Sequence, residues 1–379
     1  MKIVFLARFL PAEGSTTHMY TLASELIKIG HDVTIISAGP SKKKSDIDLF
    51  NESKSKGINH YIVKFPLKKY NTFIGKIFML FKYILVYPKV SRFIRKNQTD
   101  IVHCHYPVTT YIPAIMRFFN KKYKFITTHH IIGIPKHPLN RMANKVIAIS
   151  DELEKELEYT YGYKGEDIIK IYNGVSTDFY ISNYDKKIYK KEINIDPDIF
   201  TIGFVGSFSY RKGIDILLSS LEDIDEKYQV VLLGEGSYLK EIISNYNIKG
   251  LLHIRDFNSP INYYKAFDCL ILPSRQEGFP LVPIEAMLSQ TVVIRSGIEG
   301  ASQQIINNET GFLFENENIK ELTNYIELLM NNKQLKNELA INGQKFAHER
   351  FTSKIMMEKT LKAYEDVEIK YTIRGKNNE

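Results

Sequence analysis

Short apolar runs rich in β-branched residues alternate with longer amphipathic segments along the whole chain, and this alternation restricts the possible folds. It is typical of β-α-β units, in which a helix returns the chain to begin the next parallel strand. In the first half, strands are expected at 2–6, 32–37, 61–65, 100–105, 124–128 and 145–150. In the second half, they are expected at 200–205, 229–233, 251–254, 269–272 and 291–295. The sequence therefore predicts an α/β fold with parallel sheets.

The length of the chain predicts two domains. With 379 residues, the chain exceeds the size at which a single hydrophobic core usually stops growing. A polar stretch with mixed charges, at about 179–197, is the expected boundary. Its lysines are expected on a solvated surface rather than in a binding site. These are Lys186, Lys187, Lys190 and Lys191.

The cysteines and the N-terminus indicate a cytoplasmic protein. Cys104 and Cys269 both lie in apolar, strand-like runs, so no disulfide scaffold is expected. The apolar run within residues 1–8 is too short for a signal peptide, and a buried first strand explains it better.

The segment 275–286 carries the strongest functional signal. Glu277 and Glu285 stand eight positions apart around a Gly278-Phe279-Pro turn, after an apolar strand and before a helix that begins near Pro283. Free backbone N–H groups of such a turn favour an anionic ligand. A carboxylate can accept two hydrogen bonds from a vicinal diol, so Glu285 suits a ribose and Glu277 suits a sugar.

A second segment supplies positive charge. Gly206 follows an expected strand, and Arg211 and Lys212 come directly after its turn. Positioned cations stabilise the charge that develops on a diphosphate leaving group without a metal ion. Gly234 begins a Gly-Glu-Gly turn after the next strand, a weaker signal because glycine pairs are ordinary turn chemistry.

The first half contributes a glycine loop and a group of histidines. Gly14, after Glu13, can let the backbone approach a phosphate or an acceptor, and His18 follows with either a structural or a binding role. His129 comes at the end of an expected strand, where α/β sheets bind ligands.

Metal chemistry and dinucleotide chemistry are the alternatives for such an α/β protein. His103 and His105 share a strand face and, with His129 or His130, can imitate a zinc cluster. No acidic or thiolate partner lies at helical ligand spacing beside them, so no metal site is expected. Three Asp-x-Asp tripeptides lie in polar stretches, and the Gly-Glu-Gly turn lacks the third glycine of a dinucleotide fingerprint.

The pattern Glu277-Gly-Phe-Pro-x4-Glu285-Ala-Met resembles the donor-site signature of the retaining family 4 glycosyltransferases. The resemblance implies the GT-B fold, with two Rossmann-like, doubly wound domains facing across a cleft. It places an acceptor-side domain at 1–182 and a nucleotide-sugar donor domain at 183–352. It also implies that a C-terminal helix at 353–370 packs back on the first domain.

The resemblance also implies roles for the residues above. It implies a metal-independent transferase without a cofactor, which moves a sugar from a nucleotide diphosphate to an acceptor hydroxyl with retention. The site residues implied are His129, Lys212, Arg211 and Glu277 for catalysis, and Gly14, Gly206, Lys212, Arg211, Gly234, Glu277, Gly278, Phe279 and Glu285 for the donor.

One position departs from the family pattern. The family has an arginine directly after the second glycine, where this chain has Ser207. Either Arg211 supplies that guanidinium or Lys212 acts alone. Two hypotheses compete with a glycosyltransferase function. One is a nucleotide-sugar epimerase of similar fold, and the other is a non-catalytic basic relative that binds membrane or nucleic acid.

Charge is concentrated in one region. From Ser53 to Thr99 there are eleven Lys or Arg residues and no Asp or Glu, against a net charge of +8 for the whole chain. Residues 64–96 mix these cations with aromatic residues, which suits an anionic membrane surface on the inner face of the cell membrane. A domain helix with a solvated basic face explains the pattern equally well. No recognition motif predicts nucleic acid binding. A glycan or lipid-linked acceptor is the expected partner.

Overall fold

A computed structural model describes residues 1–65, 73–105, 107–121, 123–133, 142–182 and 185–376. The chain divides into two compact units, which are described separately below. Unit 1 contains Met1–Gly174 and Ser353–Glu379, and unit 2 contains Val175–Thr352. The division lies shortly before the polar stretch at about 179–197. Among the helices that the structure describes, none combines the length and apolar character needed to cross a bilayer.

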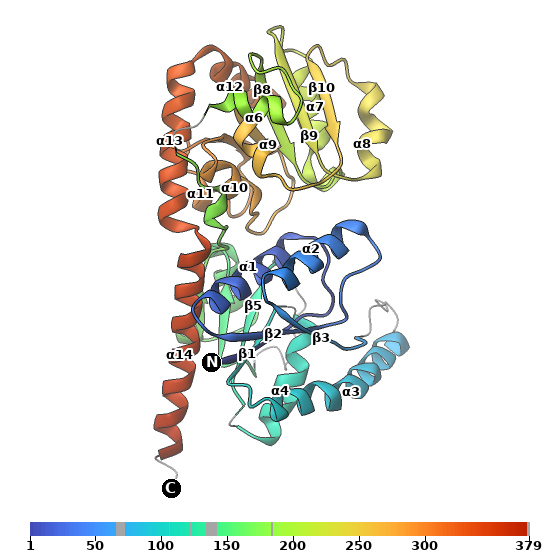
Figure 1. Cartoon of the computed structure of the whole chain (residues 1–379), viewed down its shortest axis with the longest axis vertical. Coiled ribbons are helices and arrows are strands. Elements are labelled where there is room, and N and C mark those ends of the chain that lie inside the picture. The colour runs from blue at the N-terminus through green and yellow to red at the C-terminus, as the bar shows by residue number, and fades with distance from the viewer. Residues whose placement is uncertain (66–72, 106, 122, 134–141, 183–184, 377–379) are drawn as a thin grey trace. The chain divides into compact units, whose positions relative to one another are not determined.

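Unit 1 is built on a parallel seven-stranded sheet in the order β3-β2-β1-β4-β5-β6-β7. Figure 1 labels β1, β2, β3 and β5 of this sheet. Its strands are β1 Lys2–Leu6, β2 Asp32–Ser37, β3 Asn59–Ile62, β4 Ile101–Cys104, β5 Phe125–His129, β6 Lys145–Ala148 and β7 Ile168–Lys170. Its helices are α1 Gly14–Lys28, α2 Lys44–Ser55, α3 Phe73–Lys96, α4 Tyr111–Phe119, α5 Asp151–Tyr159 and α14 Ser353–Lys376.

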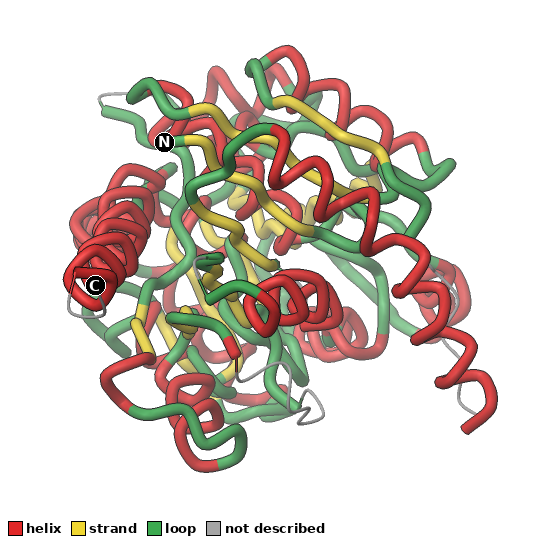
Figure 2. Tube along the Cα trace, turned by 90° about the horizontal axis from the view of Figure 1, so that it is seen from below, coloured by secondary structure: helices red, strands yellow, loops and turns green. Residues whose placement is uncertain are grey.

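Both faces of the unit 1 sheet are buried, as a parallel sheet requires. Along β1, Ile3 and Phe5 enter a core with α1 and α14, while Val4 and Leu6 enter the opposite core with α3 and α4. This alternation follows from the two-residue period of a strand. In Figure 2 the strands near the N-terminus lie side by side between helices.

Helix α14 is joined to the sheet of unit 1 by a buried side chain. Tyr364, which is fully buried, lies with its hydroxyl 2.6 Å from Nδ1 of His103 on β4. Ser353 at the start of the helix donates a hydrogen bond to Glu25 on α1. The last helix of the sequence is therefore part of the first unit's core.

Unit 2 is built on a parallel six-stranded sheet in the order β10-β9-β8-β11-β12-β13. Its strands are β8 Phe200–Val205, β9 Tyr228–Leu233, β10 Leu251–Arg255, β11 Cys269–Leu272, β12 Val292–Ser296 and β13 Phe312–Phe314. Its helices are α6 Lys186–Glu192, α7 Ile214–Leu221, α8 Ser237–Ile242, α9 Ile261–Ala266, α10 Val282–Leu288, α11 Ala301–Gln304, α12 Ile319–Asn331 and α13 Lys333–Arg350.

The expected strands agree with the structure except at the weakly patterned edges. The expected strand at 61–65 begins two residues earlier, as β3, and β7 and β13 were not predicted at all. Each of the two missed strands is three residues long and lies at the edge of its sheet. Three residues are too few to show the alternation by which strands are recognised.

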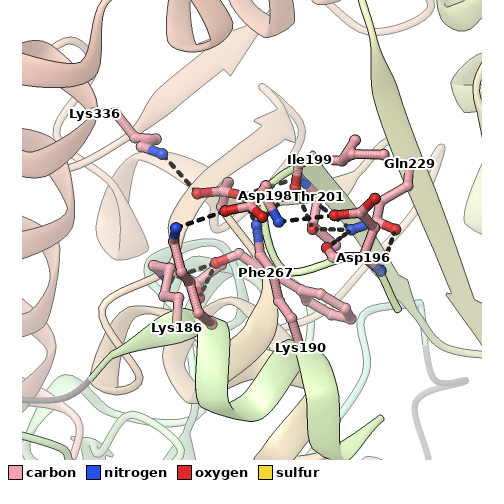
Figure 3. A network of polar contacts seen from close by, with 12 residues as sticks. Lys186, Lys190, Asp196, Asp198, Ile199, Thr201, Gln229, Phe267 and Lys336 are labelled. Carbon is pink, nitrogen blue, oxygen red and sulfur yellow. Dashed lines mark hydrogen bonds and ion pairs between the residues drawn. The ribbon is translucent and has the colours of Figure 1, made fainter. Parts of the chain in front are cut away.

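The lysines of α6 correct one sequence expectation. Lys190 is 4% exposed and donates a 2.7 Å bond to Asp268, which also accepts one of 2.6 Å from Lys336 of α13. Lys186 donates to the carbonyls of Phe267 and Gln290. Figure 3 shows Lys186, Lys190 and Lys336 in this network of polar contacts. The expectation of a solvated surface was wrong for Lys186 and Lys190, because tertiary packing turns them inward onto acceptors that lie far away in the sequence.

Asp268 anchors this network and should control the acid stability of unit 2. Burial alone would raise its pKa, but Lys190 and Lys336 outweigh burial and lower it from 3.8 to about 2. Its stabilising effect is therefore present above pH 3.8 and lost as the pH falls through about 2.

We expect Asp268→Asn to lower the free energy of unfolding at neutral pH by about 3–5 kcal/mol, because it leaves buried lysines uncompensated. Denaturant unfolding would measure this. The matched control is Asp225→Asn, which removes an exposed pair with Lys249 and should cost less than about 1 kcal/mol. If both variants lost the same free energy of unfolding, Asp268 would not have the stabilising role described here.

Candidate functional site

The strand order of unit 2 defines where a ligand can bind. From β8 the sheet continues outward to β9 and β10 on one side, and from β11 outward to β12 and β13 on the other. The loops after β8 and β11 therefore leave the carboxyl edge next to each other and diverge. Open α/β sheets bind their ligands at such a switch point. The predicted cations follow β8, and Glu277 follows β11.

Three of the predicted residues meet at this point. The ammonium of Lys212 lies 2.5 Å from Oε1 of Glu277, and the hydroxyl of Ser274 donates to the same oxygen over 2.8 Å. Nη1 of Arg211 lies 3.6 Å from Oε2 of Glu277 and donates to the carbonyl of Gln276. The structure thus brings Arg211, Lys212 and Glu277 together, although 65 residues separate the cation pair from Glu277.

The electrostatics of this group keep Glu277 ionised. Its side chain is only 8% exposed, and burial by itself would raise its pKa. The charge of Lys212 and the hydrogen bonds from Lys212 and Ser274 together hold the pKa below its usual value. Arg211 differs because its side chain is 51% exposed, so its guanidinium is available to a ligand.

Arg275 fixes the loops around this group, a role that the sequence did not reveal. Its guanidinium makes a bidentate pair with Asp215, at 2.9 and 2.7 Å, and a second pair with Glu317. It also donates to the carbonyl of Tyr210 and stacks on that residue's ring, 3.7 Å from the centroid. The Arg275 side chain therefore connects the segments that follow β8, β11 and β13.

Two glycines allow these loops to pack closely. Gly213 has a φ of +66°, and a Cβ there would overlap the carbonyl oxygen of Pro273. A Cβ on Gly234 would overlap the carbonyl oxygen of Gly206. The two predicted glycines, Gly206 and Gly234, thus lie where the turns after β8 and β9 touch. At Gly234 there is no room for a side chain, whereas at Gly206 there is room but the φ of +150° favours glycine.

Glu285 lies on α10 and is held by a residue that the sequence did not suggest. The hydroxyl of Tyr264, on α9, donates a 2.7 Å hydrogen bond to Oε2 of Glu285. Burial raises the pKa of Glu285 from 4.5 to about 7, and the Tyr264 bond lowers it slightly. Tyr264 is 21 positions away, so no local spacing could have identified it.

The turn between the two glutamates is tightly packed. Phe279 is 3% exposed, and its ring meets that of Phe351 at a centroid distance of 5.6 Å. The carbonyl oxygen of Gly278 would lie only 2.7 Å from a Cβ on Gly300, so the turn packs against the loop after β12. Phe279 therefore acts as an anchor for the turn through its ring.

The remaining predicted residues lie in unit 1. Gly14 begins α1 and is exposed, and a Cβ there would meet no atom within 4 Å. His129 ends β5, is fully buried and packs edge-on against Tyr161. Burial lowers its pKa to about 4, so the imidazole is neutral, and within the described residues neither ring nitrogen makes a hydrogen bond.

Comparisons with known proteins identify the family. Residues 12–179 match the model described as Glycosyltransferase Family 4, and residues 185–346 match the one described as Glycosyl transferases group 1. The two models together cover most of the chain. The chain belongs to the family 4-like glycosyltransferases with the GT-B fold.

The chain is also similar to individual members of the family. It is 30% identical to a capsular polysaccharide biosynthesis glycosyltransferase of Staphylococcus aureus, over 59% of this chain and 61% of the relative. It is 30% identical to an uncharacterized glycosyltransferase of Methanocaldococcus jannaschii, over 59% of this chain and 60% of the relative. The chain thus aligns with about three fifths of the length of each of these two relatives.

Solved structures show the same fold. A glycosyltransferase from Rickettsia africae superposes with a TM-score of 0.81 at 21% identity, covering 97% of this chain and 98% of that one. Anabaena HepE, solved in complex with UDP and glucose, gives a TM-score of 0.78 at 20% identity, covering 96% and 99%.

The raised pKa of Glu285 leads to a pH-dependent stability. Its stabilising contribution is fully present below pH 4.5, where the group is protonated in both states, and is lost as the pH rises through about 7. Across this window, we expect the wild type to lose about 3 kcal/mol relative to Glu285→Gln, which cannot ionise. Denaturant unfolding as a function of pH measures this difference. The control Glu349→Gln, exposed on α13, should follow the wild type. Parallel profiles of the wild type and Glu285→Gln would contradict the burial of an ionisable carboxyl group.

Proposed function

We propose that the protein is a retaining, metal-independent glycosyltransferase that moves a sugar from a nucleotide diphosphate to an acceptor hydroxyl. The observation that carries the proposal is the group of Lys212, Arg211 and Glu277 at the switch point of unit 2. Two cations beside a carboxylate, at the carboxyl ends of parallel strands, can bind a diphosphate and a sugar side by side.

The roles of these side chains follow from their charges. Lys212 and Arg211 stabilise the negative charge that grows on the diphosphate as the glycosidic bond breaks. Before the donor binds, Glu277 pairs with Lys212 and orients its ammonium group within a mostly buried site. Arg211 lies four positions after Ser207, and its side chain is exposed. In this proposal, Arg211 supplies the guanidinium group that the family has at the position of Ser207.

Glu285 binds the ribose in this proposal. Tyr264 occupies Oε2, and within the described residues Oε1 has no hydrogen-bond partner, so one oxygen remains for a diol. Glu277, with Gly278 and Phe279, forms the sugar and phosphate side. His129, as a neutral imidazole with one N–H and one lone pair, hydrogen-bonds to the donor sugar, as the resemblance implies.

The reaction exchanges one bond for another at the anomeric carbon. The bond from the anomeric carbon to the diphosphate oxygen breaks, and a bond to the acceptor oxygen forms on the same face. The acceptor proton passes to an oxygen of the leaving phosphate. This route needs no nucleophilic side chain.

Donor binding tests the proposal directly. Nucleoside diphosphates and their sugars, screened by calorimetry in the presence of EDTA, should yield at least one ligand. Lys212→Met should weaken its binding roughly tenfold to a hundredfold, because a charge-assisted hydrogen bond is lost. The control Lys345→Met removes an exposed lysine of α13 and should bind like the wild type.

The product completes this test. With an identified donor and acceptor, NMR should show the same anomeric configuration in product and donor. An inverted product would exclude retention, and a strict requirement for a divalent ion would exclude metal independence.

The proposed acceptor is a lipid-linked or cell-envelope glycan. Relatives of the chain include the capsular polysaccharide enzyme named above. From Ser53 to Ser150 there are 18 Lys or Arg residues and a single acidic residue, Asp100. Within this region, Phe118 and Phe119 at the end of α4 are 75% and 78% exposed. Of the candidate membrane segment 64–96, residues 66–72 lie outside the described part of the chain.

An exposed aromatic pair in a basic region should anchor the protein to anionic lipid. We expect co-sedimentation with phosphatidylglycerol vesicles at low salt, release at high salt, and little binding to phosphatidylcholine. Phe118→Ser with Phe119→Ser should weaken the binding. The control Tyr159→Ser removes an 80% exposed ring of α5, outside the basic region, and should not. Failure of the wild type to bind anionic vesicles at low salt would refute the membrane proposal and leave the donor chemistry untouched.

A further inference from the structure

Three histidines of unit 1 converge at the switch point of its sheet. The sheet order places β1, β4 and β5 next to one another, with the reversal of direction between β1 and β4. His18 lies on α1, which follows β1, while His105 follows β4 and His130 follows β5. One nitrogen from each ring lies within 4.8 Å of the other two.

We propose that His18, His105 and His130 form a binding site for a divalent transition-metal ion, with Zn²⁺ as the best-fitting ion. The glycosyl transfer proposed above gives these three histidines no role. The metal site is therefore an addition to that proposed function. It also changes the sequence interpretation, which considered His103 and His105 with a histidine of the next strand and left His18 out of the set.

The spacing of the nitrogens suits tetrahedral zinc. Nitrogens bound to one zinc ion at about 2.0–2.1 Å lie roughly 3.3–3.4 Å apart. Nδ1 of His105 lies 3.3 Å from Nε2 of His130. Shortening the widest separation, at most 4.8 Å, by up to roughly 1.4 Å brings the full set to coordination distance.

Unused hydrogen-bonding capacity points to a ligand. His18 is 2% exposed and His105 is 1% exposed. Within the described residues, neither ring nitrogen of His18 has a partner at full hydrogen-bond geometry, although a weaker interaction with the Asn173 side chain raises its pKa against the larger effect of burial. A buried polar atom without a partner costs about 1–3 kcal/mol, and an ion removes part of that cost.

The protonation state agrees with metal binding. Burial lowers the pKa of all three rings, that of His18 to about 4, so each imidazole is neutral and carries a lone pair at physiological pH. The pKa of His105 is lowered further by the neighbouring rings of His103 and His130. A metal ion therefore has no ligand proton to displace.

The ring of His103 packs against the three-histidine cluster and supports it. His103 stacks on His105 at a centroid distance of 4.2 Å. Both nitrogens of His103 are already used, one with Tyr364 at 2.6 Å and one with Thr128 at 2.7 Å. His103 thus supports His105 and does not itself bind the ion, which is the usual division between ligands and their supporting residues.

The atoms that would coordinate the ion determine which metals fit the site. Imidazole nitrogen suits zinc, copper, nickel and cobalt, whereas magnesium and calcium need oxygen ligands. Within the described residues, the cluster contains three histidines and no carboxylate. Three neutral ligands leave the ion with its full charge and with a fourth position for water or another oxygen ligand.

The competing explanation is a hydrogen bond between neutral rings. A separation of 3.3 Å between Nδ1 of His105 and Nε2 of His130 also fits N–H···N geometry. That arrangement would satisfy one pair of nitrogens and would not involve His18. Metal binding distinguishes the two explanations.

The test uses tag-free protein, the full chain, and Zn²⁺ and Co²⁺ as probes. After dialysis against Zn²⁺ and removal of the excess, elemental analysis should give one zinc ion per chain. Co²⁺ should produce the visible absorption of a tetrahedral site. His18→Gln and His130→Gln should each weaken Zn²⁺ binding by roughly a hundredfold or more, because each removes one of three ligands.

The control is His348→Gln, which changes an exposed histidine of α13 and should bind Zn²⁺ like the wild type. Circular dichroism confirms that each variant is folded. Zinc well below one equivalent in the wild type would overturn the proposal, as would unchanged affinity in both folded ligand variants. Nucleoside diphosphate binding, measured in EDTA, reports on the proposed function separately.

Discussion

The order in which parallel strands pair is the constraint on which the candidate sites depend. In each sheet, the direction of progress reverses once, between β1 and β4 in unit 1 and between β8 and β11 in unit 2. At a reversal, adjacent strands send their following loops in opposite directions, so side chains from distant parts of the sequence can meet over the sheet edge. Lys212 and Glu277 meet in this way in unit 2, and His18 and His105 in unit 1.

Charge is handled differently at the two ends of the unit 2 sheet. At the carboxyl edge, Lys212 and Glu277 are mostly buried but near the exposed guanidinium of Arg211, so an incoming anion can compete for the cations. Near the amino ends, Asp268 is saturated by two lysines and a backbone N–H, and its pair with Lys190 is sealed from solvent. A saturated, buried pair specifies packing, whereas an unsaturated one can serve binding.

The glutamates of the motif also differ from each other. Glu277 is ionised because Lys212 lies against it, while Glu285 has no cation among its described neighbours and is held by the hydroxyl of Tyr264. Two identical residues in one segment therefore have pKa values shifted in opposite directions. The cause is the environment of each side chain, which the eight-residue spacing does not encode.

Sequence alone determined the α/β class, most strands, the family resemblance and the segments that carry the site, because these depend on local periodicity and on motifs such as Glu277 to Glu285. Tertiary structure alone decided that Lys190 is buried, that Tyr264 holds Glu285, that Arg275 clamps three loops and that His18 joins His105 and His130. These contacts join residues from separate elements. A linear pattern reports which side of its own strand or helix a residue occupies, but only the pairing order of the strands decides which other element that side faces.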